Sequence, residues 1–303
     1  MKVAFFSETG NNQKYPRDFP NSRTEVGWCL ALDAPMCSLS VKPKEHFDLG
    51  IVIIPKTRPR VNLDFIRKSC DQVAVMQEGP HWYFQDYDIE MQFYYHQLLV
   101  NADWVYCHNE SDVSYYRGLG CEDVRVMRSL MIPEGLIPRN EWGDATMIGG
   151  NFVSWYGGFD SYIVARHIGD PISAPSMGRK QPMEDHIGEI NYLAYMSWRE
   201  WINCLSQYNI GVHLMRTHAA GTFAMNCAFH GIPCVGYKGL DTQEICHPLT
   251  TVKVGDLEHA IEVAKKLKES EEFYEICTET AQKRFQQYYT EEAWLANWRK
   301  LHE

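Results

Sequence analysis

One segment of the sequence combines residue types and spacing that could bind a phosphorylated ligand. Residues 209–248 read NIGVHLMRTHAAGTFAMNCAFHGIPCVGYKGLDTQEICHP, in which we expect a strand at 210–214 and an apolar helix at 223–229. The first turn of a helix has unpaired N–H groups and the positive end of the helix dipole, which together attract anions. Gly221 would let a phosphate approach the backbone, and Arg216 at the end of the strand could add a cation. This pattern predicts a site for an anion such as a phosphate group.

Further polar side chains follow strands that we expect in the first half of the chain. The loop SETGNNQ comes after a buried strand at 2–6, and QEGPHWYFQDY comes after a strand at 73–76. The sequence CHNE ends a third strand, at 103–107. Because ligands of parallel α/β folds bind at the carboxyl ends of the strands, we expect these loops to line a site. The selected side chains are Asn11, Asn12, Glu78, His81, Trp82, Tyr83 and His108.

The elements that must position these side chains alternate between strands and helices along the whole chain. This alternation predicts α/β architecture, with parallel doubly wound sheets covered by helices on both faces. A stretch with two prolines and two glycines at 133–148 separates two halves of similar size. The expected strands lie at 2–6, 47–55, 73–76, 103–107, 124–128, 151–154, 171–175, 190–193, 210–214 and 234–237. The expected helices lie at 25–32, 63–69, 88–101, 111–119, 159–168, 197–204, 223–229, 256–270, 271–289 and 291–301.

Composition limits the classes of protein to consider. The 303 residues include 29 Lys and Arg against 39 Asp and Glu, a net charge of −10 that argues against nucleic-acid binding by bulk charge. The ten cysteines form no CxxC pair, which is typical of free thiols in a reducing cytoplasm, and their spacing fits no usual zinc pattern. No run approaches ~20 apolar residues, and the N-terminus turns polar after Phe6. We expect a cytoplasmic monomer or homodimer without membrane insertion.

Several nucleotide and hydrolase motifs are missing from the sequence. The loop after the first strand has one glycine, so it lacks the GxGxxG fingerprint of dinucleotide-binding domains. A GxxxxGK[ST] phosphate loop and a GxSxG nucleophile elbow are absent as well. The usual dehydrogenase, phosphate-loop kinase and serine hydrolase classes are therefore disfavoured.

The segment 209–248 resembles the donor-binding segment of GT-B glycosyltransferases, especially the retaining family 4-like enzymes. Residues 231–235 (GIPCV) match the family pattern G-x-P-V-V, and Gly221 matches the glycine that opens the helix. The two glutamates of the family fall on His218 and Asn226. An Asn side chain can hydrogen-bond a ribose hydroxyl, and a His side chain can bond a sugar hydroxyl.

The resemblance implies two facing Rossmann-like domains: residues 1–140 on the acceptor side and 141–285 for the nucleotide sugar. Residues 286–303, with Trp294 and Trp298, would form a C-terminal helix that packs back on the first domain. A nucleotide-diphosphate sugar would be the donor. The donor-binding residues that we expect are Gly10, Gly157, Gly158, Arg179, Lys180, Arg216, His218, Ala220, Gly221, Thr222 and Asn226.

The same resemblance suggests how the reaction would proceed. In such families the leaving phosphate is thought to help deprotonate the acceptor, so the protein needs no nucleophile and mainly stabilises the developing charge. We expect Glu78 or His81 to be the polar group nearest the acceptor hydroxyl; both could instead be ordinary loop residues. The sequence Asp86-Tyr87-Asp88 formally reads DxD, but its place before a helix favours capping, and we expect no obligatory metal.

Two further segments bear on the acceptor. The segments QEGPHWYFQDY and CHNESDVSYY look like glycosyltransferases carried by tailed phages, which suggests a hydroxymethylated pyrimidine in DNA. Acceptor contacts would come from Asn11, Asn12, Trp82, Tyr83 and His108, with the two aromatic residues stacking on an extruded base. Glycans, lipid-linked sugars and proteins are alternative acceptors, and a non-catalytic binding protein or a nucleotide-sugar epimerase is an alternative function. A basic face for DNA could come from Lys14, Arg17, Arg23, Lys56, Arg58, Arg60, Arg67 and Lys68.

Overall fold

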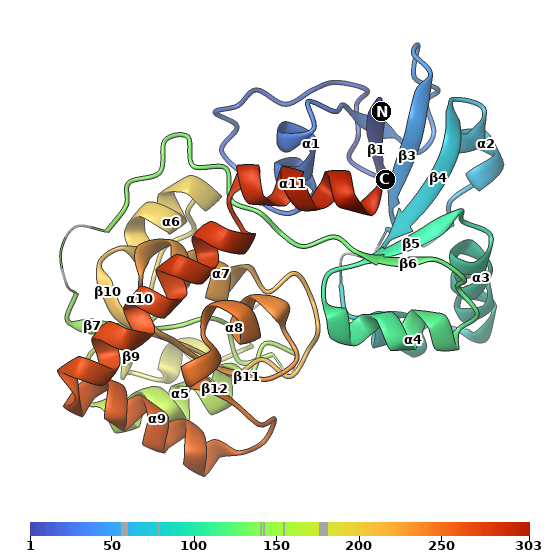
Figure 1. The fold of residues 1–303 in the computed structure, drawn as a ribbon. Coiled ribbons are helices and arrows are strands. Elements are labelled where there is room, and N and C mark those ends of the chain that lie inside the picture. Colours follow the sequence, from blue (N-terminus) through green and yellow to red (C-terminus); the bar gives the residue numbers. More distant parts are fainter. Residues whose placement is uncertain (56–59, 78, 140, 142, 154, 176–180) are drawn as a thin grey trace. The chain divides into compact units, whose positions relative to one another are not determined.

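The computed structural model describes all residues except 56–59, 78, 140, 142, 154 and 176–180. The chain forms two compact units (Figure 1). The first unit comprises Met1–Ile132, His218–Ala220 and Glu291–Glu303, and the second comprises Pro133–Thr217 and Gly221–Thr290. Among the described helices, none is both long enough and apolar enough to cross a membrane.

The first unit is built on a parallel six-stranded sheet with the order β2-β1-β3-β4-β5-β6. Its strands are β1 (Val3–Ser7), β2 (Met36–Ser38), β3 (Phe47–Ile53), β4 (Cys70–Met76), β5 (Trp104–Cys107) and β6 (Val124–Val126). Its α-helices are α1 (Glu25–Ala31), α2 (Leu63–Arg67), α3 (Ile89–Val100), α4 (Val113–Gly118) and α11 (Glu291–Leu301), and its short 3-10 helices are η1 (His81–Asp86) and η2 (Glu110–Asp112).

Side chains of this sheet alternate between two cores because successive strand residues point to opposite faces. On β1, Ala4 and Phe6 belong to the core under α2, α3 and α4, whereas Val3 and Phe5 belong to the core under α1 and α11. The second core includes Trp294 of α11, whose Nε1 donates a hydrogen bond to the carbonyl of Arg128 at 2.8 Å. The C-terminal helix therefore packs on the sheet of the first unit, as predicted.

The second unit has a parallel six-stranded sheet with the order β12-β11-β10-β7-β8-β9. Its strands are β7 (Ala145–Ile148), β8 (Ile172–Ala174), β9 (Ile190–Tyr192), β10 (Tyr208–His213), β11 (Cys234–Tyr237) and β12 (Thr251–Val252). Its α-helices are α5 (Gly158–Ile168), α6 (Trp198–Leu205), α7 (Thr222–His230), α8 (Asp241–Cys246), α9 (Leu257–Glu269) and α10 (Glu271–Tyr288), and its 3-10 helices are η3 (Glu184–His186) and η4 (Pro248–Thr250).

This sheet is also covered on both faces. Ile148 of β7 lies in the core formed with α5, α9 and α10, and the neighbouring Met147 lies in the core formed with α6 and α7. Helix α6 begins with a capping box: the Ser197 hydroxyl accepts from the Glu200 N–H at 3.4 Å, and the Glu200 carboxylate accepts from the Ser197 N–H at 2.8 Å. The expected doubly wound α/β architecture is therefore confirmed in both units.

The structure corrects some expected elements. The first strand of the second unit is β7, which lies inside the stretch read as a linker, and the expected strand at 151–154 is wrong for its described residues. Strands β2 and β12 and helix α8 were not expected. They are short, and β2 follows a turn in which Asp33 has a positive φ of 50°.

Candidate active site

The expected anion site lies where β10 leads into α7 in the second unit. Gly221 precedes α7 in a left-handed conformation with φ of 61°, and its carbonyl accepts a hydrogen bond from Thr242 Oγ1 at 2.7 Å. A Cβ atom at this position would lie 2.3 Å from the same hydroxyl. Glycine is therefore required both by the backbone conformation and by the close approach of Thr242. The helix that follows begins at Thr222, which is half-buried.

Arg216 lies between β10 and α7 but already has an anionic partner. Its Nη2 atom is 2.8 Å from Asp160 Oδ2, and Tyr237 Oη donates to the same oxygen at 3.0 Å. Burial, and then the hydrogen bond to Asp160, raises the pKa of Tyr237 to about 12, so this hydroxyl stays protonated. A diphosphate bound at Arg216 would have to share or replace the carboxylate of Asp160.

The paired glycines at the start of α5 bring chain segments close together. A Cβ atom on Gly157, whose φ is 64°, would lie 2.0 Å from the carbonyl oxygen of Leu214. A Cβ atom on Gly158 would lie 2.2 Å from the carbonyl oxygen of Asn151. Packing against the backbone thus explains both glycines without a ligand. The predicted clamp residues Arg179 and Lys180 lie outside the described residues.

Asn226 occupies a buried position on α7. Its side chain is 2% exposed, and its Oδ1 atom has no hydrogen-bond partner among the described residues. A buried carbonyl oxygen without a donor is unfavourable, and such atoms often mark the place of a ligand or water molecule. This oxygen could accept a hydrogen bond from a ligand hydroxyl.

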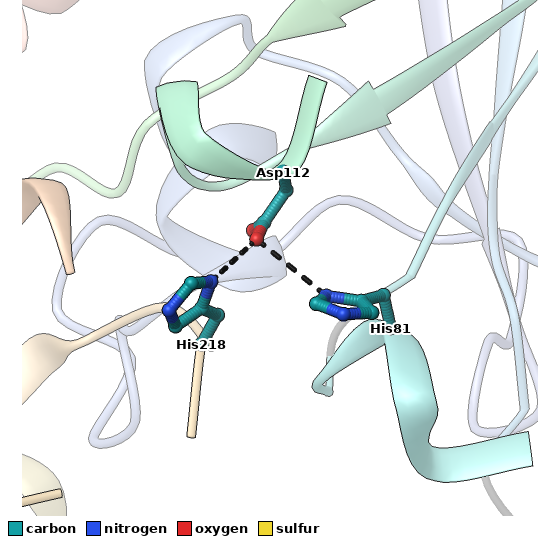
Figure 2. Close-up of side chains that lie close together, drawn as sticks. All are labelled: His81, Asp112 and His218. Carbon is teal, nitrogen blue, oxygen red and sulfur yellow. Dashed lines mark hydrogen bonds and ion pairs between the residues drawn. The ribbon is translucent and has the colours of Figure 1, made fainter. Parts of the chain in front are cut away.

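His218 belongs to the first unit, where it joins a cluster with His81 and Asp112 (Figure 2). Nδ1 of His218 lies 2.8 Å from Asp112 Oδ1, and Nδ1 of His81 lies 3.6 Å from the same oxygen. The two imidazole rings are 6.0 Å apart and nearly perpendicular, and the ring of Tyr115 packs 4.0 Å from that of His81. Thus the structure brings together two predicted residues through a carboxylate that the sequence analysis did not select.

Asp112 is held at the start of α4, at the end of η2. Burial alone would raise the pKa of Asp112, but hydrogen bonds from His218 and Asn109, together with the nearby imidazole of His81, outweigh burial and hold the pKa well below its usual range. The amide of Asn109 donates to Asp112 Oδ2 at 3.0 Å and to the carbonyl of Ala219 at 3.1 Å. Asp112 is therefore a fixed carboxylate that orients both histidine rings.

Four other site residues that were predicted in the first unit each have contacts of their own: Gly10 for the donor, and Asn11, Asn12 and His108 for the acceptor. Asn12 has φ of 62°, and its Oδ1 accepts from the Ser38 N–H at 3.0 Å, so it stabilises the turn beside β2. Gly10 packs against the backbone there, since a Cβ atom would lie 1.9 Å from the carbonyl oxygen of Cys37. Asn11, next to it, is exposed. His108 is 4% exposed and stacks on Trp28 with ring centroids 5.6 Å apart.

The aromatic pair Trp82 and Tyr83 is half-buried in η1, directly after His81. Tyr83 packs edge-on against Phe84 at 5.8 Å, so part of its ring belongs to the core. Glu78 lies outside the described residues. The backbone carbonyl of Ala220 accepts a hydrogen bond from Ser129 Oγ at 3.2 Å.

The DxD-like sequence has the structural role that was expected. Asp88 caps α3: its Oδ1 accepts a hydrogen bond from the Met91 N–H at 2.9 Å. Asp86 is exposed at the end of η1.

Four of the six candidate basic residues that the structure describes form ion pairs. Lys14 pairs with Asp33, Arg17 with Glu291 through both terminal nitrogens at 2.7 Å, Arg60 with Glu90, and Arg67 with Asp103. Arg23 and Lys68 are exposed, and Lys56 and Arg58 lie outside the described residues. Where the structure describes these side chains, neighbouring carboxylates offset much of the positive charge.

Sequence reasoning missed two acidic residues, Asp112 and Asp160. Asp112 lies in the segment CHNESD, after the same strand as His108, so its position after a buried strand was a usable signal. Asp160 lies in the first turn of α5, a position that is ordinarily explained by the helix dipole.

No protein-family model matches this sequence, and no curated protein matches it. Solved structures do match. Sucrose-phosphate synthase from Thermosynechococcus elongatus is similar over 100% of this chain and 98% of its own, with 12% identity and a TM-score of 0.69. An alpha-glucosyltransferase solved with UDP and a 13-mer DNA is similar over 100% of this chain and 99% of its own, with 12% identity and a TM-score of 0.65.

A third similar structure is S. aureus TarM in complex with fondaparinux, alpha-GlcNAc-glycerol and UDP. It is 11% identical, with a TM-score of 0.64, over 83% of this chain, which spans about half of TarM (55%). Together with the two parallel six-stranded sheets, these likenesses define the fold as that of the GT-B glycosyltransferases, two Rossmann-like units with C-terminal helices.

Proposed function

We propose that this protein is a glycosyltransferase that moves a sugar from a nucleotide-diphosphate donor to an acceptor hydroxyl. The observation that carries the proposal is the left-handed Gly221 turn that opens α7 after β10, in a chain with the GT-B fold along its full length. The second unit would bind the donor and the first unit the acceptor. UDP in two of the similar structures supports a uridine nucleotide as the first donor to test.

The donor site would combine backbone and side-chain groups. The N–H groups at the start of α7 and the positive end of its dipole favour a diphosphate, and glycine leaves room for it to approach. Arg216, whose side chain is 56% exposed, can turn from Asp160 towards a phosphate. The unpartnered Oδ1 of Asn226 is suited to accept from a ribose hydroxyl.

The chemical step would depend on stabilising the leaving diphosphate. As the bond between the sugar and the phosphate breaks, negative charge grows on the phosphate oxygens, and α7 and Arg216 would stabilise that charge. In the retaining route that we propose, which needs no metal ion at the diphosphate, the same phosphate oxygen takes the proton of the acceptor hydroxyl. His81, oriented by Asp112, would hold that hydroxyl, with Glu78 as the alternative.

A hydroxymethylated pyrimidine in DNA is the acceptor that we propose first. A similar alpha-glucosyltransferase was solved with UDP and DNA containing an HMU base, at 13% identity and with a TM-score of 0.63. The half-buried Trp82 and Tyr83 next to His81 could stack on an extruded base. Because ion pairs offset most of the described basic residues considered, we expect weak binding to unmodified DNA.

A panel of nucleotides and nucleotide sugars tests the donor claim. The wild-type protein should gain thermal stability with at least one uridine nucleotide, because a ligand that binds only the folded state stabilises it by mass action. A lack of any shift across UDP, other nucleoside diphosphates and their sugars would rule the proposal out.

Mass spectrometry of acceptors tests the finer claim. Hydroxymethylated DNA incubated with mixed donors should gain the mass of one sugar per modified base, while matched unmodified DNA should not. If a glycan, lipid or protein gains the sugar instead, that molecule and not DNA is the acceptor. Donor conversion without any acceptor would indicate an epimerase.

A further inference from the structure

The cluster of His81, Asp112 and His218 has a second chemical capacity besides holding an acceptor. All three offer a ligand atom, two imidazole nitrogens and one carboxylate oxygen, and these atoms lie within 4.8 Å of one another. The residues come from η1, from the end of η2 and from the His218–Ala220 segment, and their ligand atoms converge on one point (Figure 2). We infer that His81 Nδ1, Asp112 Oδ1 and His218 Nδ1 form a binding site for a divalent transition-metal ion of the zinc class.

The distances suit such an ion. Bonds of about 2.0–2.1 Å to a tetrahedral ion place its ligand atoms about 3.3 Å apart. Asp112 Oδ1 lies 2.8 Å from His218 Nδ1 and 3.6 Å from His81 Nδ1, on either side of that spacing. The ion would fit after side-chain rotations that lengthen the first contact by about 0.5 Å and shorten the second by about 0.3 Å. The same rotations must bring the two imidazole nitrogens, which lie within 4.8 Å of each other, to that spacing. Three protein ligands would leave one coordination position open.

The residues around the two histidines make the cluster more favourable for a cation than two histidines alone would be. Asp112 is 6% exposed and carries the negative charge that two neutral imidazoles lack. Its other oxygen, Oδ2, is fixed by the Asn109 amide at 3.0 Å, an outer contact of the kind that orients metal-binding carboxylates. Ser111 Oγ lies 3.3 Å from His218 Nδ1 and could follow that ring as it turns. Imidazole and carboxylate ligands together suit zinc and its neighbours better than Ca²⁺ or Mg²⁺, which prefer oxygen.

The alternative is a cluster without a metal ion, in which hydrogen bonds join the histidines to Asp112. A proton on His218 Nδ1 satisfies the 2.8 Å contact with Asp112, but it leaves His81 Nδ1 3.6 Å from that oxygen, beyond a good hydrogen bond. An ion bound at the centre would satisfy all three atoms at once. It would also fix the His218–Ala220 segment, whose Ala219 carbonyl already accepts from Asn109 at 3.1 Å.

Metal titration of the full-length protein tests this inference without donor or acceptor. The protein, first treated with a chelator, is titrated with Co²⁺ while its visible absorption is recorded, and Zn²⁺ is then added as a competitor. We expect one Co²⁺ per chain, displaced by Zn²⁺, and at least tenfold weaker binding in each of His81→Gln, His218→Gln and Asp112→Asn. Circular dichroism identifies any variant that fails to fold. If Asp112→Asn fails to fold, the two histidine variants decide the result.

His46 provides a matched control. It forms a His–Asp pair with Asp71 at the same 2.8 Å distance on the exposed surface. Among the described residues no third ligand atom joins this pair in a metal-binding group, so His46→Gln should bind Co²⁺ like the wild type. The inference is overturned if the wild type binds no stoichiometric metal, or if binding survives both His81→Gln and His218→Gln. Because this titration uses neither nucleotide nor acceptor, its failure would leave the proposed transferase function standing.

Discussion

Arg216 and Asp160 form an ion pair at the end of β10 that a donor diphosphate would disturb. Asp160 is partly buried, with 15% of its side chain exposed, and it also accepts a hydrogen bond from Tyr237. The carboxylate can therefore keep one partner when Arg216 turns away. Such an arrangement holds the guanidinium in place before the donor binds and releases it for a ligand with more negative charge.

Replacing Arg216 with Ala should weaken UDP binding by about tenfold or more, because a charge-assisted hydrogen bond contributes roughly 1.5–3 kcal/mol. Arg166→Ala is the matched control, since this arginine lies on the last turn of α5 and pairs with Glu189 instead. Isothermal titration calorimetry with UDP compares the two variants. Equal affinities would show that Arg216 does not contact the diphosphate.

Three buried histidines of the second unit should make stability depend on pH. Burial lowers the pKa of His213, His230 and His247 to about 4, against a usual value near 6.5. Because the pKa values are lower in the folded protein than in the unfolded chain, the stability that the neutral histidines contribute is fully present above about pH 6.5. This contribution is lost as the pH falls towards 4. At pH 5 each of these histidines would lower the free energy of unfolding by at most about 2 kcal/mol.

Urea unfolding between pH 7 and pH 4.5 measures this dependence. His247→Gln should reduce the slope of unfolding free energy against pH, whereas His259→Gln, at an exposed position on α9, should leave it unchanged. An unchanged slope in His247→Gln would mean that His247 titrates normally in the folded protein.

At the scale of elements, the turn between β10 and α7 carries the proposed donor site, and two glycines allow a matched comparison. Gly221 and Gly169 both have a positive φ, of 61° and 84°, but a Cβ atom would clash with Thr242 only at Gly221, and nothing lies within 4 Å at Gly169. Both alanine variants should lose about 1 kcal/mol of stability from the left-handed backbone. Gly221→Ala should lose more, and it alone should lose UDP affinity. Chemical unfolding and calorimetry give both quantities, and equal losses in the two variants would contradict the steric account.

Most elements were predictable because their burial pattern is local. The runs VAFF in β1 and VAVM in β4 are fully buried, and Gly221, Gly231 and Pro233 delimit α7 in the sequence itself. The sequence does not predict strand β7, because its four residues, ATMI, follow a stretch with prolines and glycines that is typical of a linker. The contact between Asp112 and His218 joins residues 106 positions apart, so only packing could reveal it.

At the scale of the whole molecule, the central claim is that a GT-B chain with this α7 turn transfers sugar from a nucleotide donor. The likenesses to two solved structures, each at 12% identity, define the GT-B fold of this chain. The first unit includes the C-terminal helix α11 and the His218–Ala220 segment as well as Met1–Ile132, so the 303-residue chain, and not a fragment of it, is the correct material for the assay.

The most direct measurement is the amount of nucleoside diphosphate that the full-length protein releases from a panel of nucleotide sugars, quantified by mass spectrometry with and without hydroxymethylated DNA. We predict that a uridine donor is consumed, that hydroxymethylated DNA accelerates the release, and that Arg216→Ala and Gly221→Ala slow it. The account would be contradicted if no donor were consumed with any acceptor, or if both variants released nucleoside diphosphate at the wild-type rate.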